Sequence, residues 1–221
     1  MHGVYGLDYY HVRKTSRALR YRLRRRTDEV ERALRRYVEG RLQTVVDVGT
    51  ADALMLATLR ERLGHLSFIG LEMSRELLLA SHDRATRKLQ ADALSLPIRS
   101  GVADAVVATA VLEHVEHPGQ MMAETFRVLR PGGILVLTTP EPTLERISAA
   151  LGLLKEARHS HTFNLRQLQQ IATGAGYVVV EAGKFMFSPI GFPAEKFLER
   201  VLGPLGLELL MANQLLVARK A

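Results

Sequence analysis

The sequence predicts an α/β protein with a doubly wound, seven-stranded sheet that is mostly parallel and has an antiparallel last strand. Three observations favour this fold class. Short apolar runs alternate with segments of helical spacing from Leu42 onward. Most of these runs are nearly continuous, as expected for strands buried on both faces. Hydrophobic residues make up 47% of the 221 residues, which is enough for a sizeable core.

Seven segments have the character of strands, and four have helical spacing between or after them. The last two strands are separated by a long excursion, which allows them to pair antiparallel. The expected strands are residues 44–48, 67–72, 88–91, 102–109, 132–139, 177–182 and 213–218. The expected helices are residues 52–63, 74–86, 120–129 and 164–173.

The charge distribution divides the chain into two parts. Residues 1–41 hold 12 Lys and Arg against 5 Asp and Glu, whereas the remaining 180 residues hold 18 of each, so the net charge of +7 lies before Leu42. We therefore expect a basic helical N-terminal segment over residues 1–41 and one α/β domain over residues 42–221. Residues 184–212, rich in Phe, Leu, Pro and Gly, are predicted to form an apolar lid or acceptor-side insertion.

The basic segment allows two interpretations. Residues 13–26 carry eight Lys and Arg and no acid. In a single helix, one face would carry Val12, Thr15, Leu19, Leu23, Val30 and Leu34. That face predicts a helix packed on the α/β domain, and the basic residues suit an anionic partner such as a membrane surface or a phosphorylated substrate. Nucleic acid is not expected, because no aromatic residues interleave the basic ones as a stacking platform.

Several classes of site are excluded by composition. The chain has no cysteine, so disulfides, thiolate metal sites and cysteine nucleophiles are absent. No apolar run reaches the roughly 18 residues that a membrane span needs. A cytoplasmic protein is expected, in contact with a membrane at most through its surface.

The loop after the first strand has the shape of a nucleotide-cofactor site. Gly49 follows the strand that contains Asp47, and we expect the next helix to offer N–H groups to an anion. Ala51 and Ala53 stand where such loops usually have further glycines; their methyl groups can be accommodated if φ is negative there, but they limit how closely a ligand can approach. Glu72 lies 23 residues after Gly49, a spacing typical of an acid that binds ribose hydroxyls. An ordinary βα turn remains the alternative interpretation of the loop alone.

The acid at Asp47 distinguishes two cofactor classes. An NAD site needs the pattern G-x-G-x-x-G and does not require an acid two residues before the first glycine. A carboxylate there suits a ligand with a cationic amino group, such as S-adenosylmethionine (SAM). Further evidence comes from "QADALSLP", with Asp92 at the end of the third strand, from "LEH" after the fourth, and from "FRVLRPGG" before the fifth.

With these motifs, residues 42–183 resemble the class I SAM-dependent methyltransferases, in their small-molecule, "type 11"-like branch with a Rossmann-like sheet. The resemblance implies SAM as the cofactor and a small-molecule, lipid or saccharide acceptor. It implies that Asp47, Gly49, Thr50 and Ala51 hold the methionine part, and that Thr109 and Ala110 approach the methionine part or the sulfonium. It further implies that Glu72 binds the ribose, that Met73 packs beside the adenine, and that Asp92 and Ala93 bind the adenine edge.

His114 is the first candidate for a catalytic base, because it follows the end of the fourth strand and imidazole titrates near neutral pH. His161 is a second candidate, and a structural role is the alternative for both. No metal is predicted, since neither HExxH nor HxxEH is present, and Ala110 stands where some metal-dependent relatives carry a glutamate.

A hydroxyl oxygen is the expected acceptor atom. No [N/D/S]-P-P-[Y/F] motif follows the fourth strand, which argues against methylation of adenine or amide nitrogen. Two other functions stay open. One is a non-catalytic SAM-fold protein that binds partners through its basic helix, and a weaker one is an NAD-dependent oxidoreductase.

Overall fold

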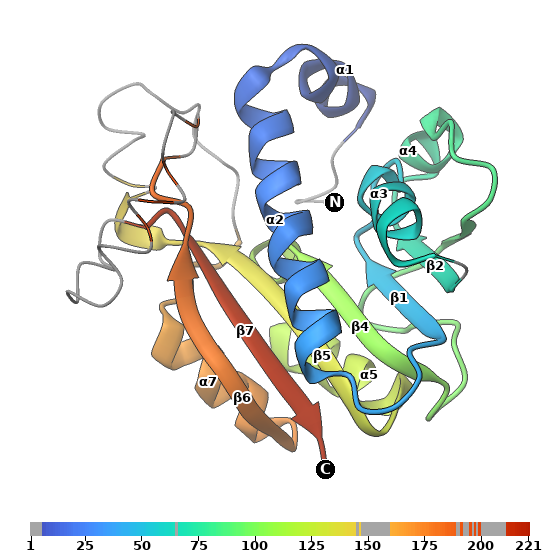
Figure 1. Cartoon of the computed structure of the whole chain (residues 1–221), viewed down its shortest axis with the longest axis vertical. Helices are drawn as coiled ribbons and strands as arrows, with labels where there is room; N and C mark the ends of the chain where they lie inside the picture. Colours follow the sequence, from blue (N-terminus) through green and yellow to red (C-terminus); the bar gives the residue numbers. More distant parts are fainter. Residues whose placement is uncertain are drawn as a thin grey trace.

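A computed structural model of the chain describes residues 6–64, 66–144, 146, 160–188, 191, 195, 197, 199 and 211–221. A seven-stranded sheet runs through the molecule with helices on both of its faces (Figure 1). The strands are β1 (Thr44–Val48), β2 (Ser67–Glu72), β3 (Arg87–Gln90), β4 (Ala103–Thr109), β5 (Leu129–Pro140), β6 (Tyr177–Phe185) and β7 (Asn213–Lys220). The helices are α1 (Leu7–Thr15), α2 (Arg17–Tyr37), α3 (Leu54–Leu63), α4 (Arg75–Ala80), α5 (Pro118–Val128), α7 (Leu165–Gly174) and the short 3₁₀ helix η1 (Leu112–His114).

The strand order is β3-β2-β1-β4-β5-β7-β6. β1 pairs in parallel with both β2 and β4, and β4 pairs in parallel with β5. β7 lies between β5 and β6 and is antiparallel to both. The predicted fold class is therefore confirmed, including the antiparallel last strand. The order reverses between β1 and β4, and in such sheets ligands bind beside this switch point at the carboxyl ends of the strands.

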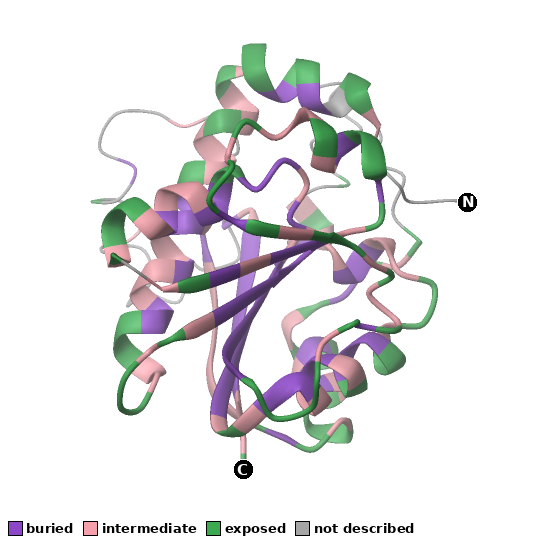
Figure 2. Cartoon of the chain, turned by 90° about the vertical axis from the view of Figure 1, so that its right-hand side faces the viewer, coloured by how far each residue is buried: buried purple, intermediate pink, exposed green. Residues whose placement is uncertain are grey.

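Alternate residues of the central strands pack into two separate cores. Val46 and Val48 of β1 contact the core beneath α5 and α7, whereas Val45 contacts the core beneath α2 and α3. Figure 2 shows strands that are buried along much of their length, between helices whose outer surfaces are exposed. Burial on both faces explains why the strands appear in the sequence as continuous apolar runs.

The helix predicted over residues 74–86 ends at Ala80 and is shorter than expected. Its start is as expected, because the Ser74 side chain accepts a hydrogen bond from the N–H of Leu77. The residues after Ala80 turn around Asp83, whose carboxylate accepts from the Ala85 N–H at 3.0 Å and forms an ion pair with Arg60 at 2.7 Å. This interaction with α3 outweighs the helical spacing of the local sequence.

The Pro-Gly-Gly segment lies inside β5 and does not form a separate turn before it, because β5 already begins at Leu129. A Cβ atom at Gly133 would lie 2.9 Å from the carbonyl oxygen of Arg130 and 3.1 Å from those of Ala103 and Asp104. Only glycine permits this close approach, where the register between β4 and β5 shifts.

The basic N-terminal segment folds as two helices and not as one. Ser16 has an extended backbone with ψ 116°, and its side chain caps α2 by accepting from the Leu19 N–H. This break removes Val12 from the expected apolar face, and Val12 is 54% exposed. Val30 and Leu34 of α2 are buried in the core, as the apolar pattern predicted.

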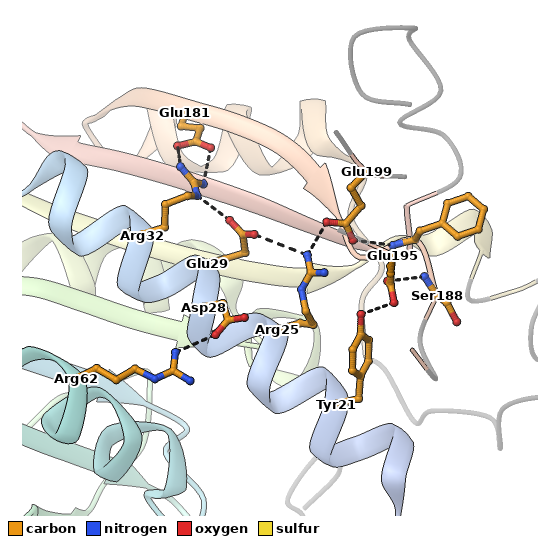
Figure 3. A network of polar contacts seen from close by, with 11 residues as sticks. Tyr21, Arg25, Asp28, Glu29, Arg32, Arg62, Glu181, Ser188, Glu195 and Glu199 are labelled. Atoms are coloured by element: carbon orange, nitrogen blue, oxygen red, sulfur yellow. Dashed lines mark hydrogen bonds and ion pairs between the residues drawn. The ribbon is translucent and has the colours of Figure 1, made fainter. Parts of the chain in front are cut away.

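Polar contacts join α2 to the residues after β6 (Figure 3). The Arg25 side chain is almost fully buried and donates from Nη2 to Glu199 Oε2 at 2.6 Å. The Tyr21 hydroxyl donates to the carboxylate of Glu195. Both glutamates thus face the same side of α2, and they fix the chain after β6 against this helix.

The same two glutamates also bind the main chain that follows β6. Glu199 accepts from the Phe187 N–H at 3.1 Å, and Glu195 accepts from the Ser188 N–H at 2.9 Å. Each carboxylate therefore bridges α2 and the end of β6. Most of segment 184–212 lies outside the described residues, so its role as an apolar lid stays a prediction.

Other arginines of α2 are also paired inside the fold. Arg26 donates to Asn213 of β7 at 3.0 Å, and Arg32 forms an ion pair with Glu181 of β6 at 2.7 Å. The positive charge of this helix is thus partly neutralised by the α/β domain, and α2 is a packed element of the molecule.

We predict that Arg25→Gln lowers the free energy of unfolding by about 3–5 kcal/mol, because it leaves the Glu199 carboxylate without its buried cation. The control is Arg20→Gln, which removes the same charge from an exposed position of the same helix. It should change stability by less than about 0.5 kcal/mol. Urea denaturation of both variants measures the difference, and equal small effects would show that the buried pair contributes nothing.

Candidate active site

The loop after β1 lies directly against the chain that follows β4. Gly49 has a φ angle of +74°, and its N–H donates to the carbonyl of Leu71 at 2.8 Å. A Cβ atom at Gly49 would overlap the side chain of Val111. Glycine is therefore required both for the backbone conformation and for the contact between the two strand ends.

Three alanines at these strand ends have a left-handed backbone. Their φ angles are 52° at Ala51, 60° at Ala53 and 55° at Ala110. The condition of negative φ, under which Ala51 and Ala53 would be accommodated without strain, is not met. For a residue with a Cβ atom this conformation costs about 1–2 kcal/mol. Strain of this kind is typical of functional sites, where the surrounding fold enforces it.

Asp47 lies at the centre of the site and is buried, with only 3% of its surface exposed. Its neighbours in the sheet are Gly70 of β2 and Val107 of β4. Burial raises the pKa of Asp47 to about 7, and the charge of Glu72 acts in the same direction. A buried carboxylate of this kind is stabilised in its charged form by a cationic ligand group.

Glu72 connects the loop after β1 with the start of α4. One carboxylate oxygen accepts from the Ala51 N–H at 2.9 Å, and the other accepts from the Ser74 N–H at 2.9 Å. An ionised carboxylate offers about four lone-pair positions, so these two bonds leave room for ligand hydroxyls.

The N–H groups of the loop are largely used within the fold. Thr50 donates to the carbonyl of Leu71 at 3.0 Å, and Ala53 donates to that of Thr50 at 2.9 Å. The Leu54 N–H, at the start of α3, donates to the carboxylate of Asp52 at 3.2 Å. The loop and the first helical turn thus offer fewer donors to an anion than the sequence indicated.

The ends of β2 and β3 place further predicted residues beside Glu72. The Ala91 N–H donates to the Glu72 carbonyl at 3.0 Å, which holds the two strand ends together. Asp92 is exposed and accepts from the Leu94 N–H at 2.9 Å. Met73 is 39% exposed, and the half-buried Ala93 follows Asp92. These positions form one row along the carboxyl edge of the sheet.

The end of β4 forms the other side of the site. Thr109 stands beside Thr138 of β5 in the sheet, and the Ala110 N–H donates to the Thr138 carbonyl at 2.8 Å. These bonds fix Thr109 and Ala110 at the carboxyl edge, next to the contact between Gly49 and Val111.

The structure brings His114 and His161 to the same corner. His114 is the last residue of η1, and the His161 N–H donates to the Glu113 carbonyl at 3.1 Å. The Nε2 atom of His161 lies 3.2 Å from the carbonyl oxygen of Glu116. Nitrogen can only donate to a carbonyl, so in the neutral ring Nδ1 remains as the acceptor.

Gln214 of β7, which the sequence did not indicate, fixes this corner. Its side-chain amide is fully buried and donates to the Phe163 carbonyl at 2.7 Å and to the Pro140 carbonyl at 3.0 Å. The chain around His161 is thereby tied to the end of β5. No local pattern in the sequence marks this role.

Arg13 of α1 was also missed as a site residue. Arg13 is 7% exposed and forms an ion pair with Asp52, in the loop after β1. α1 also packs against α4, and the Tyr10 hydroxyl lies 3.1 Å from Nε2 of His82. The basic segment therefore reaches the proposed cofactor loop, a contact that links residues far apart in the sequence.

A family model described as a methyltransferase domain matches residues 17–182. The chain belongs to this methyltransferase family. The resemblance to class I SAM-dependent methyltransferases, a family whose cofactor is SAM, is thus confirmed. The match begins at the first residue of α2, within the segment that the charge distribution had separated from the α/β domain.

Individual proteins are similar to this methyltransferase over part or most of its length. A malonyl-[acyl-carrier protein] O-methyltransferase from Marinomonas sp. is 29% identical over 140 residues, which cover 61% of this chain and 52% of that protein. This chain spans about half the length of the curated relatives that it matches. The solved structure of a SAM-dependent methyltransferase from Archaeoglobus fulgidus has a TM-score of 0.63 at 16% identity, covering 88% of this chain and 94% of that one.

A third comparison supports the same fold. Phosphoethanolamine N-methyltransferase 2 from Haemonchus contortus, solved in complex with SAM, has a TM-score of 0.62 at 16% identity. The alignment covers 87% of this chain and 52% of that protein.

The residues of this methyltransferase fit SAM chemically. The buried carboxylate of Asp47 suits the ammonium group of the methionine part, and Glu72 has acceptor positions for two ribose hydroxyls. The loop between them is held closed by internal hydrogen bonds, as a preformed site requires.

We predict that Ala51→Gly raises the free energy of unfolding by about 0.5–1 kcal/mol. Glycine relieves the left-handed strain, and this gain exceeds the added entropy of the unfolded chain. Ala57→Gly in α3 is the control and should lower stability by about 1 kcal/mol, because its backbone is helical. Thermal unfolding without ligand distinguishes the opposite signs, and a loss at both positions would contradict the strain.

We predict that affinity for SAM falls about tenfold per pH unit below pH 7, as Asp47 becomes protonated. Because its folded pKa is raised, Asp47 favours folding below its ordinary pKa, and this contribution is lost as pH rises toward 7. An ammonium ligand favours the ionised form, so binding strengthens over the same interval. Calorimetry between pH 5.5 and 8.5 measures the stability of the protein and its affinity for SAM. The variant Asp47→Asn should bind SAM weakly at every pH. A pH-independent affinity in the unaltered protein would contradict the assignment.

Proposed function

We propose that this methyltransferase transfers the methyl group of SAM to a hydroxyl oxygen of a small-molecule, lipid-linked or sugar-linked acceptor. The observation that carries the proposal is the meeting of His114 and His161 at the carboxyl end of β4. The similarity to a malonyl-[acyl-carrier protein] O-methyltransferase supports oxygen as the accepting atom.

The cofactor is proposed to lie along the carboxyl edge of β4, β1, β2 and β3. Asp47 binds its ammonium group beside the Gly49–Ala51 backbone, including Thr50, and Glu72 binds the ribose hydroxyls. At the two ends, Met73, Asp92 and Ala93 contact the adenine, whereas Thr109 and Ala110 approach the sulfonium. Bound here, SAM supplies a methyl group that is already activated for displacement, so the protein mainly has to align the acceptor and exclude water.

A histidine serves as the general base, because a neutral hydroxyl is a poor nucleophile until its proton is removed. His161 presents Nδ1 as an acceptor when Nε2 donates to Glu116. His114 lies on the adjoining η1 and is the other candidate.

Two other functions, an NAD-dependent oxidoreductase and a non-catalytic SAM-fold protein, were left open by the sequence. The NAD-dependent alternative has lost its support, because the family model is that of a methyltransferase. A non-catalytic SAM-fold protein remains the rival. Incubation with methyl-labelled SAM and a panel of hydroxyl-bearing metabolites, lipid headgroups and acyl thioesters tests it, since a protein that binds SAM but labels no acceptor would support the rival.

We predict that changing the catalytic base to alanine lowers turnover about 10²–10⁴-fold, measured once an acceptor is known. The affinity of the variant for SAM should stay within about threefold of that of the unaltered protein. His114→Ala and His161→Ala identify which histidine it is. His117→Ala is the control, an exposed histidine that precedes α5. Losses under tenfold for both candidates would show that neither is the base.

Contact with an anionic membrane surface stays a further proposal. No helix among the described residues is long and apolar enough to cross a membrane. Within 13–26, Lys14, Arg17, Arg20 and Arg24 are exposed, whereas Arg25 and Arg26 are paired inside the fold. Arg17, Arg20 and Arg24 share one face of α2. Replacing these three by Gln should abolish sedimentation with anionic vesicles at low salt. If the unaltered protein does not sediment with these vesicles, both this proposal and a peripheral membrane location are wrong.

A further inference from the structure

Arg13, in the N-terminal helix α1, is buried at a peripheral position where an exposed arginine would be expected. Its side chain is buried although the flanking residues Val12 and Lys14 are exposed. It forms an ion pair with Asp52, and its charge also acts on Asp47. An arginine on a peripheral helix is thus directed at the loop that follows β1.

This loop is rich in acids and has few donors to offer. Asp47 and Asp52 are both buried there, and the Glu72 carboxylate bonds to the loop backbone at Ala51. The N–H groups of Gly49, Thr50, Ala51, Ala53 and Leu54 all donate to acceptors inside the fold. A ligand carboxylate that enters the loop therefore meets negative charge and largely occupied N–H groups.

The methionine part of SAM carries such a carboxylate next to its ammonium group. If the ammonium lies at Asp47, the carboxylate is only two bonds further along the ligand and stays near the same acids. It needs a cation, because burying a carboxylate beside other carboxylates is strongly unfavourable. Arg13 forms an ion pair with one of these buried acids, Asp52, and its charge acts on another, Asp47.

We propose that Arg13 binds the carboxylate of the methionine part of SAM, so that α1 completes the cofactor site. A guanidinium has five N–H donors in a planar fork, so it can bind Asp52 and a second carboxylate together. Asp52 then acts as a positioning residue that holds Arg13 over the loop. The inference rests on the proposed seating of the cofactor with its ammonium group at Asp47.

The test compares two ligands that differ only in the part that Arg13 contacts. S-adenosylhomocysteine has the amino-acid group, whereas 5′-methylthioadenosine keeps adenine, ribose and sulfur and lacks it. Arg13→Gln should raise the dissociation constant of S-adenosylhomocysteine about 10–100-fold, as expected for loss of a charge-assisted hydrogen-bonded pair. The dissociation constant of 5′-methylthioadenosine should change less than about threefold in the same calorimetric titrations.

Arg17→Gln is the matched control, because it removes the same charge from an exposed position just beyond Ser16. It should leave both affinities unchanged. Arg13→Lys keeps the charge but not the fork, and it should fall between the unaltered protein and Arg13→Gln for S-adenosylhomocysteine alone. Thermal unfolding without ligand confirms that each variant is folded, and if Arg13→Gln is not, the comparison is made with Arg13→Lys.

Each outcome is decisive. Equal weakening of both ligands would show that Arg13 only orders the loop, and unchanged affinity for both would show that it has no part in binding. Either result overturns the inference and leaves the proposed seating intact. If the unaltered protein prefers neither ligand, or Asp47→Asn spares S-adenosylhomocysteine, the seating itself fails and the inference falls with it.

Discussion

The contact between Gly49 and Val111 is the constraint on which the site depends. It brings the chain leaving β1 against the chain leaving β4, and only a residue without a side chain fits between them. The loop then needs left-handed backbone at Ala51 and Ala53 to reach α3, and its N–H groups turn back onto Leu71 and Glu72. The positions of the acids along the sheet edge follow from this close crossing.

The N-terminal helices are part of the same arrangement. α1 reaches the loop after β1 through Arg13. α2 reaches the chain after β6 through Tyr21 and Arg25, as Figure 3 shows. β6 is parallel to the central strands, because it and they are separated by the antiparallel β7. Its end therefore emerges at the edge where the cofactor loop lies, and one helical pair contacts both sides of that edge.

The sequence predicted the centre of the sheet well, because burial on both faces leaves a local signal in strands such as β1, β4 and β5. It also predicted where Asp47, Glu72 and Asp92 lie, since parallel strands end at a common edge. Contacts between distant segments left no such signal. The pairing of Arg13 with Asp52, the support of the His161 corner by Gln214, and the turn around Asp83 each depend on the completed fold.

The backbone angles of Ala51 and Ala53 illustrate a different limit. Alanine favours negative φ, so the left-handed conformation at these two positions does not follow from residue type. The fold overrides this preference, because the Ala51 N–H is held by Glu72 and the Ala53 N–H by the Thr50 carbonyl. Residue preference is informative where packing is loose and fails where hydrogen bonds fix the chain.

The insertion of β7 between β5 and β6 has a consequence for the order of assembly during synthesis. β5 pairs with β7, and even their nearest partners in the sequence, Pro140 and Asn213, are separated by a long stretch of intervening chain. β6, which is made earlier, bonds along its length to β7 among the described strands, so it has no partner in the sheet until residues 213–220 have left the ribosome. Pairing at such sequence separation is slow, because loop closure precedes any gain from contacts. Until then the edge of β5 that pairs with β7 is unpaired. A chaperone or another copy of the chain would therefore bind the nascent chain in this half of the sheet.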